Sequence, residues 1–448
     1  MSDLTPLRDA VDTLADRALP PDFGELERRA ARRGRRRLAL GAAAAAAVIG
    51  GSALAVNGLD ETRTAPIEQP KPGPRPNGWV AVDAYQGDYF HDVYDGDVIY
   101  LARPGEEPHQ LQVAGSDAAN DACPTWSPDG TRLMFGRLTG PSGAASSGAE
   151  LVIVPVGQDG TSGTPTVIGL DGFKVIGGGP EGFDAHPCAT WAPDGRWVAL
   201  AGTGEVWVVD THTGAIRHLP NLRPSDLEWR PGTDELTIAG DTGTSRGAPT
   251  LSTPVTVYSV STGELRRLGS VETAHVTWSP DGTSLAYTGG EREPETRQLG
   301  LVDGDGSNKR VLVADIGPTL HGIGPVWSPT GDRIAYQRCD GDQPGVECSG
   351  ERHEVVLVNV ADGTETVIEP PRADGHEWYP FTVSWSPDGT TLLYAAWRED
   401  GQRLPGGVIA VPADKPSDAT VLIDSIEPVP NYYSHRWAAI QMWGRQPG

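Results

Sequence analysis

Five of the ten histidines precede tryptophans by two to nine residues, a spacing that could gather imidazole groups at one end of the molecule. They are His186, His275, His321, His376 and His435. Neutral imidazoles bind metal ions, and imidazoles that titrate near neutral pH sense pH. We expect these histidines near a ligand-binding face. A convergent metal site and ordinary hydrogen bonding in loops are the alternatives, and we predict neither a resident metal nor a cofactor.

Two aromatic residues are candidates for the same face. Trp378 and Tyr379 lie in the sequence GHEWYPF and could contact a ligand there. The alternative is packing inside the fold.

Two short motifs match catalytic or metal-binding sequences but lack their context. Gly243-Thr-Ser245-Arg-Gly247 matches a nucleophile elbow, which must join a strand to a helix. Here it lies in a loop rich in Gly and Thr, so we predict no catalytic residue. Asp303-Gly-Asp305-Gly begins like a calcium loop, but its twelfth position is Ala314 instead of a bidentate glutamate. We expect a hairpin turn.

The four cysteines suggest two disulfides. Cys123 and Cys188 each lie three residues before a repeated tryptophan, so neighbouring strands could bring them together. Cys339 and Cys348 bracket one loop and could close it. Free thiols for the first pair and a zinc site are the alternatives, although no CxxC spacing is present.

A repeated motif must position these residues. Trp126-Ser-Pro-Asp129-Gly recurs with variations at spacings of roughly 40 to 65 residues, which indicates stacked supersecondary units. The tryptophans are Trp126, Trp191, Trp229, Trp278, Trp327 and Trp385, and the turn aspartates are Asp129, Asp194, Asp281 and Asp388. Pro, Asp and Gly in this order favour a tight turn.

Each repeat predicts four antiparallel strands. An apolar stretch ends in the tryptophan, the turn follows, and three alternating segments separated by loops or glycine turns complete the unit. Such units arranged radially form an all-β propeller. The flat tryptophan is expected to wedge between neighbouring blades.

The repeats resemble the WD40-like repeats of TolB-type propellers over roughly residues 77–447. This resemblance implies a fold and a mode of binding, but it implies no single activity, because such propellers serve as binding platforms, sensors and accessory domains of peptidases.

We expect seven blades, with six or eight as alternatives. Six units carry the motif, and residues 79–113 supply the second, third and fourth strands of another blade. Its first strand is expected from residues 434–440 at the opposite end of the chain. This arrangement would close the ring and leave no open sheet edge between blades.

The ligand face is expected where the long loops lie. These loops cover residues 138–150, 240–253, 289–298 and 338–353. In a propeller they share one end with the connections into the innermost strands, which carry the histidines. Long loops on a rigid scaffold commonly bind ligands.

Residues 38–59 form a stretch without ionisable side chains, long enough for a helix of roughly 33 Å to cross a bilayer. Seven arginines in residues 28–37 precede it, so the positive-inside rule places the N-terminus in the cytoplasm and the propeller outside. A signal peptide cleaved near Ala55 is the alternative.

Residues 1–37 are expected to be cytoplasmic and residues 60–76 to be a Pro-rich linker to the propeller of residues 77–448. Leu4, Leu7, Val11 and Leu14 follow helical spacing and could dock on a partner. A regulator bound at residues 1–30 is therefore possible, and a solvated helix beside the membrane is the alternative.

The net charge of −24 argues against non-specific nucleic-acid binding and favours basic partners. We predict a membrane-anchored, non-enzymatic platform that binds a protein, peptide or envelope ligand. The alternatives are a transmembrane signalling protein that holds a regulator such as a sigma factor, although one anti-sigma zinc motif, HxxxCxxC, is absent, and a metal-dependent hydrolase or lyase.

Overall fold

The structure is a computed structural model, and the part of it described here begins at Asn77. It comprises residues 77–88, 93–114, 120–139, 148–173, 188–202, 204–222, 224–240, 253–273, 275–289, 298–314, 316, 324–339, 353–398, 407–424 and 443–445. These residues belong to one compact unit, Lys71–Gly448. Among them no helix is long and apolar enough to cross a membrane. The expected segments 1–37, 38–59 and 60–76 lie outside the described residues.

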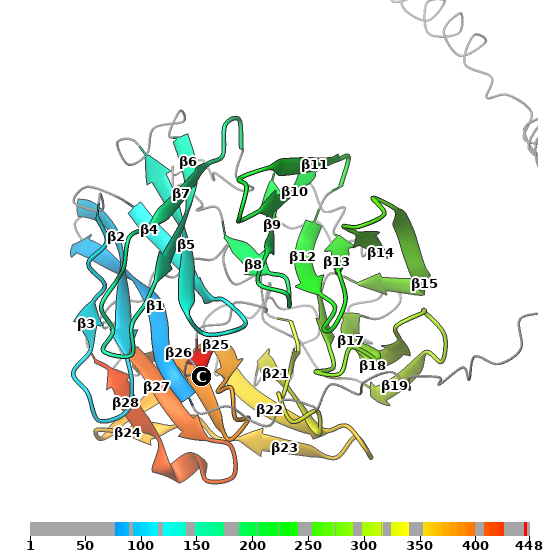
Figure 1. Cartoon of the computed structure of the whole chain (residues 1–448). Coiled ribbons are helices and arrows are strands. Elements are labelled where there is room, and N and C mark those ends of the chain that lie inside the picture. The colour runs from blue at the N-terminus through cyan, green and yellow to red at the C-terminus, as the bar shows by residue number, and fades with distance from the viewer. Residues whose placement is uncertain are drawn as a thin grey trace, which may run out of the picture. The chain divides into compact units, whose positions relative to one another are not determined.

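Seven antiparallel sheets make up this unit, and Figure 1 shows them arranged around a common axis. Blade 1 contains β29 (Trp443–Arg445), β1 (Asn77–Asp88), β2 (Val93–Ala102) and β3 (His109–Gln110). Blade 2 contains β4 (Asn120–Trp126), β5 (Arg132–Thr139), β6 (Gly148–Pro155) and β7 (Thr166–Gly169). Blade 3 contains β8 (Ala189–Trp191), β9 (Trp197–Gly202), β10 (Glu205–Asp210) and β11 (Ile216–Pro220).

The remaining blades follow in chain order. Blade 4 contains β12 (Pro224–Trp229), β13 (Glu235–Gly240), β14 (Thr253–Ser259) and β15 (Leu265–Thr273), and blade 5 contains β16 (His275–Trp278), β17 (Ser284–Gly289), β18 (Gln298–Asp303) and β19 (Arg310–Val313). Blade 6 contains β20 (Val326–Trp327), β21 (Arg333–Cys339), β22 (His353–Asn359) and β23 (Glu365–Ile368). Blade 7 contains β24 (Arg372–Ala373), β25 (His376–Trp385), β26 (Thr391–Arg398), β27 (Gly407–Pro412) and β28 (Thr420–Ile423), with a short 3-10 helix at Pro416–Asp418. The expected seven-bladed all-β propeller is confirmed.

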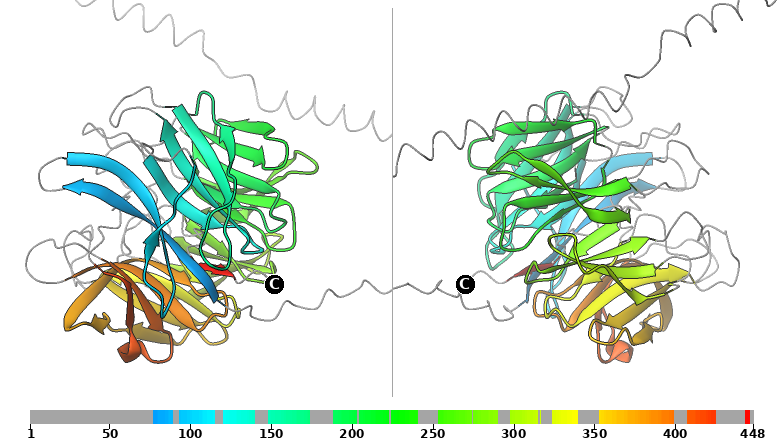
Figure 2. Two further views of the ribbon diagram at one scale, coloured as in Figure 1. Left: turned by 60° about the vertical axis from the view of Figure 1, so that its left-hand side comes forward. Right: turned by 90° about the vertical axis from the view of Figure 1, so that its right-hand side faces the viewer.

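The two ends of the described chain close the ring. Strand β29 pairs with β1, with Asn77 opposite Arg445 and Val80 opposite Trp443. Figure 2 shows the C-terminal strand in red beside the N-terminal strand in blue. Closure from the C-terminus was expected, but the strand that performs it begins at Trp443, and the predicted segment 434–440 lies outside the described residues.

The repeated motif forms the turn from the first to the second strand of a blade, as expected. In blade 2 the Ser127 hydroxyl donates to Asp129 Oδ1 at 2.6 Å, and the same carboxylate oxygen accepts the Thr131 amide at 3.0 Å. The Ser127 oxygen also accepts the Arg132 amide at 3.0 Å. The side chains of Ser127 and Asp129 therefore stabilise the turn by binding each other and the backbone amides that follow. Blades 5 and 7 repeat this arrangement around Asp281 and Asp388.

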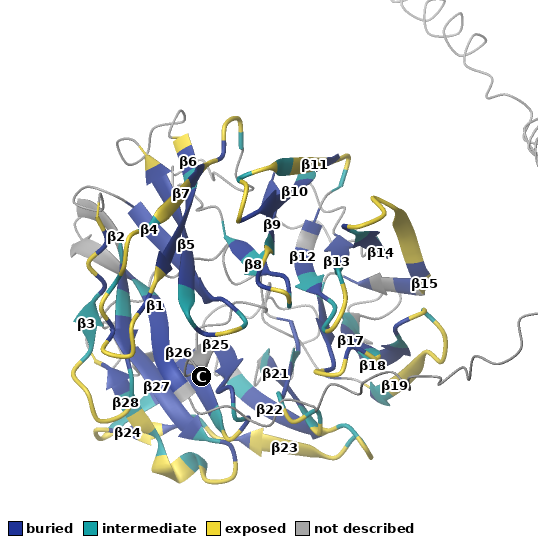
Figure 3. Cartoon of the chain, in the orientation of Figure 1, coloured by how far each residue is buried: buried dark blue, intermediate teal, exposed yellow. Residues whose placement is uncertain are grey.

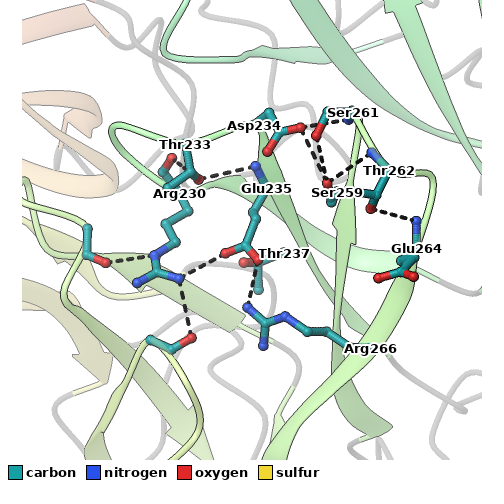
Figure 4. A network of polar contacts seen from close by, with 12 residues as sticks. Arg230, Thr233, Asp234, Glu235, Thr237, Ser259, Ser261, Thr262, Glu264 and Arg266 are labelled. Atoms are coloured by element: carbon teal, nitrogen blue, oxygen red, sulfur yellow. Dashed lines mark hydrogen bonds and ion pairs between the residues drawn. The ribbon is translucent and has the colours of Figure 1, made fainter. Parts of the chain in front are cut away.

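Blade 4 replaces Ser-Pro-Asp-Gly by Arg230-Pro-Gly-Thr and uses the arginine to join two blades. The Arg230 Nε donates to the Gly282 carbonyl at 2.8 Å, and its Nη1 donates to Glu235 Oε2 at 2.8 Å (Figure 4). A Cβ at Gly282 would lie 2.4 Å from the Pro231 carbonyl oxygen, so this turn of blade 5 needs glycine.

All six repeated tryptophans are buried at junctions between blades. The indole of Trp191 donates to the Thr125 carbonyl at 3.2 Å, and Trp229 donates to Thr190 at 3.1 Å. Trp385 makes the equivalent bond to Val326 at 3.2 Å. In each case the acceptor directly precedes the tryptophan of the preceding blade. The expected wedge is confirmed.

Seven clusters of buried apolar residues lie within the described part of the chain, one at each blade junction. Figure 3 shows the consequence, with buried segments along the inner strands and exposed ones at the rim. The cluster between blades 7 and 1 is the one without a tryptophan among its described members. The core is therefore distributed between blades, and each blade depends on its neighbours.

Deleting residues 443–448 should destabilise the propeller because the inner edge of β1 loses its partner. We expect the free energy of unfolding to fall by about 2–3 kcal/mol, from lost hydrogen bonds, in denaturant titration. Deleting only residues 446–448 retains β29 and is the control. Equal stability of both truncated chains would contradict the closure.

The indole bonds can be tested by comparing two tryptophans. Trp191→Phe keeps an aromatic ring but removes the bond to Thr125, whereas the Trp327 Nε1 has no hydrogen-bond partner among the described residues. We expect Trp191→Phe to cost about 1–2 kcal/mol more than Trp327→Phe in the same titration. A larger cost at Trp327 would show that the indole bond does not contribute.

Candidate binding face around the propeller axis

The first strand of each blade runs along the axis, and we call β29, β4, β8, β12, β16, β20 and β25 the axial strands. The position three residues before the motif tryptophan carries Cys123, Cys188, Asp226 and His275 in blades 2 to 5. These residues lie toward the end at which the chain enters each axial strand, which we call the loop end. The opposite end carries the motif turns and is called the turn end.

A disulfide joins the first two of these positions. Cys123 and Cys188 are bonded, with their Cα atoms 5.2 Å apart and a sequence separation of 65. The bridge links axial strands of blades 2 and 3, as the repeat spacing predicted. The second predicted bridge is not tested, because Cys348 and the side chain of Cys339 lie outside the description.

An acid–base pair occupies the equivalent positions in blades 4 and 5. The Asp226 carboxylate lies 4.0 Å from the His275 Nδ1, and its Oδ2 accepts the Val276 amide at 2.9 Å. Two residues along β12, Glu228 Oε1 accepts the Trp278 amide at 3.5 Å. Two carboxyl groups of β12 therefore accept hydrogen bonds from two amides of β16 that lie two residues apart.

Burial dominates the electrostatics of these carboxyl groups. Asp226 is fully buried, which raises its pKa well above the usual range, and the neighbouring Glu228 adds to this rise. Burial also raises the pKa of Glu228 to about 8, although hydrogen bonds from the Trp278 amide and from Thr277 oppose it. Burial therefore favours the neutral form of these groups, although Glu228 keeps part of its surface exposed.

Blades 1 and 2 place further charged groups near the disulfide. Asp121 binds Arg137 in a bidentate pair, with distances of 2.7 and 2.8 Å, and both residues are 5% exposed. Asp83 Oδ2 accepts the Cys123 amide at 3.2 Å, and burial raises the pKa of Asp83. Charged side chains thus surround the disulfide as well as the junction between blades 4 and 5.

Of the five histidines predicted near the ligand face, the described residues include two. His275 begins β16 with 16% of its side chain exposed, and His376 begins β25. His186, His321 and His435 lie outside the described residues, so the structure does not show whether the five histidines converge. Among the described residues no group of three or more His, Cys, Asp or Glu side chains could hold a metal ion.

The aromatic candidates lie within strand β25, not in a loop. Trp378 is fully buried, and its indole donates to the Ala373 carbonyl at 3.1 Å. This arrangement agrees with the alternative of packing inside the blade. Tyr379 pairs with Trp397 in the sheet, and its side chain is outside the description.

The structure describes one of the two short motifs that resemble catalytic or metal-binding sequences. Asp303 and Gly306 form the expected hairpin turn, in which the Gly306 amide donates to the Asp303 carbonyl at 2.8 Å. The Gly243–Gly247 loop lies outside the described residues.

Sequence analysis missed the carboxyl groups of the axial strands. Asp121 lies in β4, and Asp226 and Glu228 lie in β12. Aligning the repeats on their tryptophans would have revealed them, because Glu228 occupies the position held by Thr125, Thr190 and Thr277.

One pocket lies away from this face. It has a volume of about 350 Å³ and lies between blades 7 and 1. Its lining consists of Gly78, Arg103, Pro104, Thr391, Ala410, Pro412 and Thr420. These residues lie at the turn end, and Arg103 is already paired with Glu106 and with the Gln158 carbonyl.

Removing the disulfide should destabilise the propeller. A loop of 65 residues suggests that Cys123→Ser with Cys188→Ser costs about 4 kcal/mol, through the entropy of the unfolded chain. Denaturant titration under oxidising conditions measures this cost. Reduction of the unmutated chain is the control and should produce a larger loss than reduction of the double variant. An unchanged denaturation midpoint in the double variant would show that the disulfide does not stabilise the fold.

Comparisons with known proteins find folds similar to this one in proteins of several functions. No family model matches the chain, and no curated protein matches its sequence. An acylaminoacyl peptidase structure is 12% identical with a TM-score of 0.51, over 78% of this chain and 51% of that one.

Two other structures have lower TM-scores. TolB from Acinetobacter baumannii is 15% identical with a TM-score of 0.40, over 78% of this chain and 81% of that one. The propeller domain of the Trilobed protease from Pyrococcus furiosus is 13% identical with a TM-score of 0.48, over 79% and 95%. These similarities concern the fold alone, and they include both peptidases and TolB. The sheet order and the equivalent position of the repeats in the blades identify the fold of this chain as a seven-bladed propeller.

Proposed function

We propose that the chain is a non-enzymatic binding platform whose loop end receives a protein or peptide ligand. The supporting observation is the row of Cys123, Cys188, Asp226 and His275 at the loop end of adjoining axial strands, where 16% of the His275 side chain is exposed. The disulfide and the strand closure make this scaffold rigid, which limits the entropy lost on binding.

Charge favours a basic ligand. The chain has a net charge of −24. The electrostatic field of a negatively charged protein increases the association rate of cationic segments and disfavours acidic ones. A basic peptide or a basic patch on an envelope protein is therefore the proposed ligand.

The proposal includes a location. Residues 38–59 would anchor the chain in the cell membrane, with the arginines of residues 28–37 retained in the cytoplasm and the propeller outside. The disulfide between Cys123 and Cys188 suits an oxidising compartment.

Transmembrane signalling is the second candidate, because the chain has 37 residues before the proposed span. In that case ligand binding by the propeller would control a cytoplasmic regulator held by residues 1–30. Deleting these residues should then abolish regulation while ligand binding by the propeller persists.

The platform can be tested with the compact unit Lys71–Gly448, which contains every described strand. We expect a displayed peptide library to yield basic sequences, with dissociation constants that rise at least tenfold between roughly 0.05 and 0.5 M salt, because screening weakens charge attraction. His275→Ala should weaken binding, and the exposed rim variant Arg310→Ala should not.

Two outcomes would contradict this assignment. Enrichment of acidic or uncharged peptides without salt dependence would exclude a charge-selective platform. Stoichiometric metal that survives dialysis and disappears in His275→Ala would favour the metal-dependent enzyme instead.

A further inference from the structure

The pocket between blades 7 and 1 is bounded by small side chains. Its volume is about 350 Å³, in the range of roughly 300 to 1,000 Å³ that is typical of ligand pockets. Thr391 and Thr420 line it from blade 7, and Gly78 lines it from blade 1. Arg103 also borders it, but its guanidinium donates to the Gln158 carbonyl of blade 2. The charge of Arg103 is therefore engaged with the following blade.

Strand register identifies the counterparts of the two threonines in the other blades. Thr391 directly precedes the residue that pairs with the motif tryptophan, and Thr420 lies opposite Ala410 on the outermost strand. The positions equivalent to Thr391 hold Trp79, Arg132, Trp197, Glu235, Ser284 and Arg333 in blades 1 to 6. The positions equivalent to Thr420 hold His109, Thr166, Arg217, Arg266, Arg310 and Thr366. Each of these six blades thus places an arginine or a tryptophan at one of the two positions, whereas blade 7 has threonine at both.

The arginines at the first position reach into the following blade. Arg132 donates to the Gly195 carbonyl at 2.7 Å, and its guanidinium lies 4.9 Å from the ring centre of Trp191. The guanidinium of Arg333 lies 5.7 Å from the ring centre of Trp385. A stacked and hydrogen-bonded guanidinium therefore covers the motif tryptophan of the next blade at the turn end.

Blades 3 and 4 fill the same space with other arginines. Arg217 donates to the Val260 carbonyl, and Arg230 donates to the Gly304 carbonyl at 3.4 Å within the network of Figure 4. Val260 and Gly304 hold the position of Pro104, which lines the pocket between blades 7 and 1. The pocket thus corresponds to a place that a guanidinium occupies at other junctions.

The chain enters blade 1 beside this pocket. Strand β1 begins at Asn77, next to Gly78, and no motif turn precedes it, because β29 comes from the opposite end of the sequence. Residues 71–76, Lys-Pro-Gly-Pro-Arg-Pro, belong to the same compact unit. Arg75 lies two residues before Asn77, and two extended residues span roughly 7 Å. Its side chain therefore begins within reach of the pocket.

We propose that residues 71–76 dock in the pocket between blades 7 and 1, where the Arg75 guanidinium takes the place that arginines of the preceding blade occupy at other junctions. The Pro104 carbonyl and the hydroxyls of Thr391 and Thr420 supply acceptors for its N–H groups. Arginine suits this place better than lysine, because its planar group can stack and bond at the same time. The negative charge of the chain, −24, also favours a cation here.

Docking turns this segment into a strap. It closes the last junction from the N-terminal side, as β29 closes it from the C-terminal side. In a membrane-anchored chain the strap holds the turn end toward the anchor and leaves the loop end facing outward. This orientation rests on the proposed anchor, whereas the docking does not.

Hydrogen exchange of the full-length chain tests the strap at the start of β1. We expect Arg75→Ala to raise the exchange rates of residues 77–82 by about fivefold, the effect of losing one hydrogen bond. Arg63→Ala removes a cation of the same linker farther from β1 and should leave these rates unchanged. Equal rates in the two variants would overturn the proposal.

A cation supplied by blade 7 tests whether the effect passes through the pocket. Thr420→Arg introduces the residue type that blades 3, 4 and 5 carry at this position, and in this background Arg75→Ala should no longer change the exchange rates. Thr391→Arg introduces the residue type of blades 2 and 6 and serves if Thr420→Arg fails to fold. An undiminished effect of Arg75→Ala in a folded background variant would overturn the docking.

Arginine methyl ester distinguishes the strap from a pocket open to external ligands. The added compound should slow exchange of residues 77–82 in the Arg75→Ala chain and leave the unmutated chain unchanged, because the strap already fills the pocket. Equal slowing in both chains would show that the pocket receives cations from outside and would also overturn the proposal.

Discussion

The packing of one flat tryptophan between neighbouring blades is the interaction on which this fold depends. A single four-stranded sheet has two faces and cannot bury both alone. Each junction buries a cluster of apolar side chains, and at six of the seven the cluster contains a repeated tryptophan. Because every blade relies on two neighbours, the ring must close, and β29 provides that closure at the junction whose described cluster has no tryptophan.

The fold could be predicted because its determinants are local and repeated. The turn around Asp129 needs only residues within five positions of one another, so the sequence motif and the structure coincide. The closing strand was harder to place, since β29 spans three residues and lies outside the repeat pattern. A strand this short carries too little alternation to be distinguished from segments such as 434–440.

The candidate site was less predictable, because its properties arise from contacts between blades. The disulfide followed from the spacing of Cys123 and Cys188 relative to their tryptophans. Histidines were considered because imidazole is a common ligand, yet burial raises the pKa values of the carboxyl groups of Asp226 and Glu228. Nothing in their types marks them as unusual. Their burial is the largest cause of these shifts, and burial is a property of the assembled ring.

One position of the repeat joins neighbouring axial strands in two different ways. Blades 2 and 3 are joined covalently at the position three residues before the motif tryptophan, whereas blades 4 and 5 place Asp226 and His275 there, 4.0 Å apart. The repeat therefore fixes where these side chains lie, because the register of each axial strand follows from its tryptophan and turn. It leaves the residue type at that position free to vary from blade to blade, since the core between blades is formed by other positions.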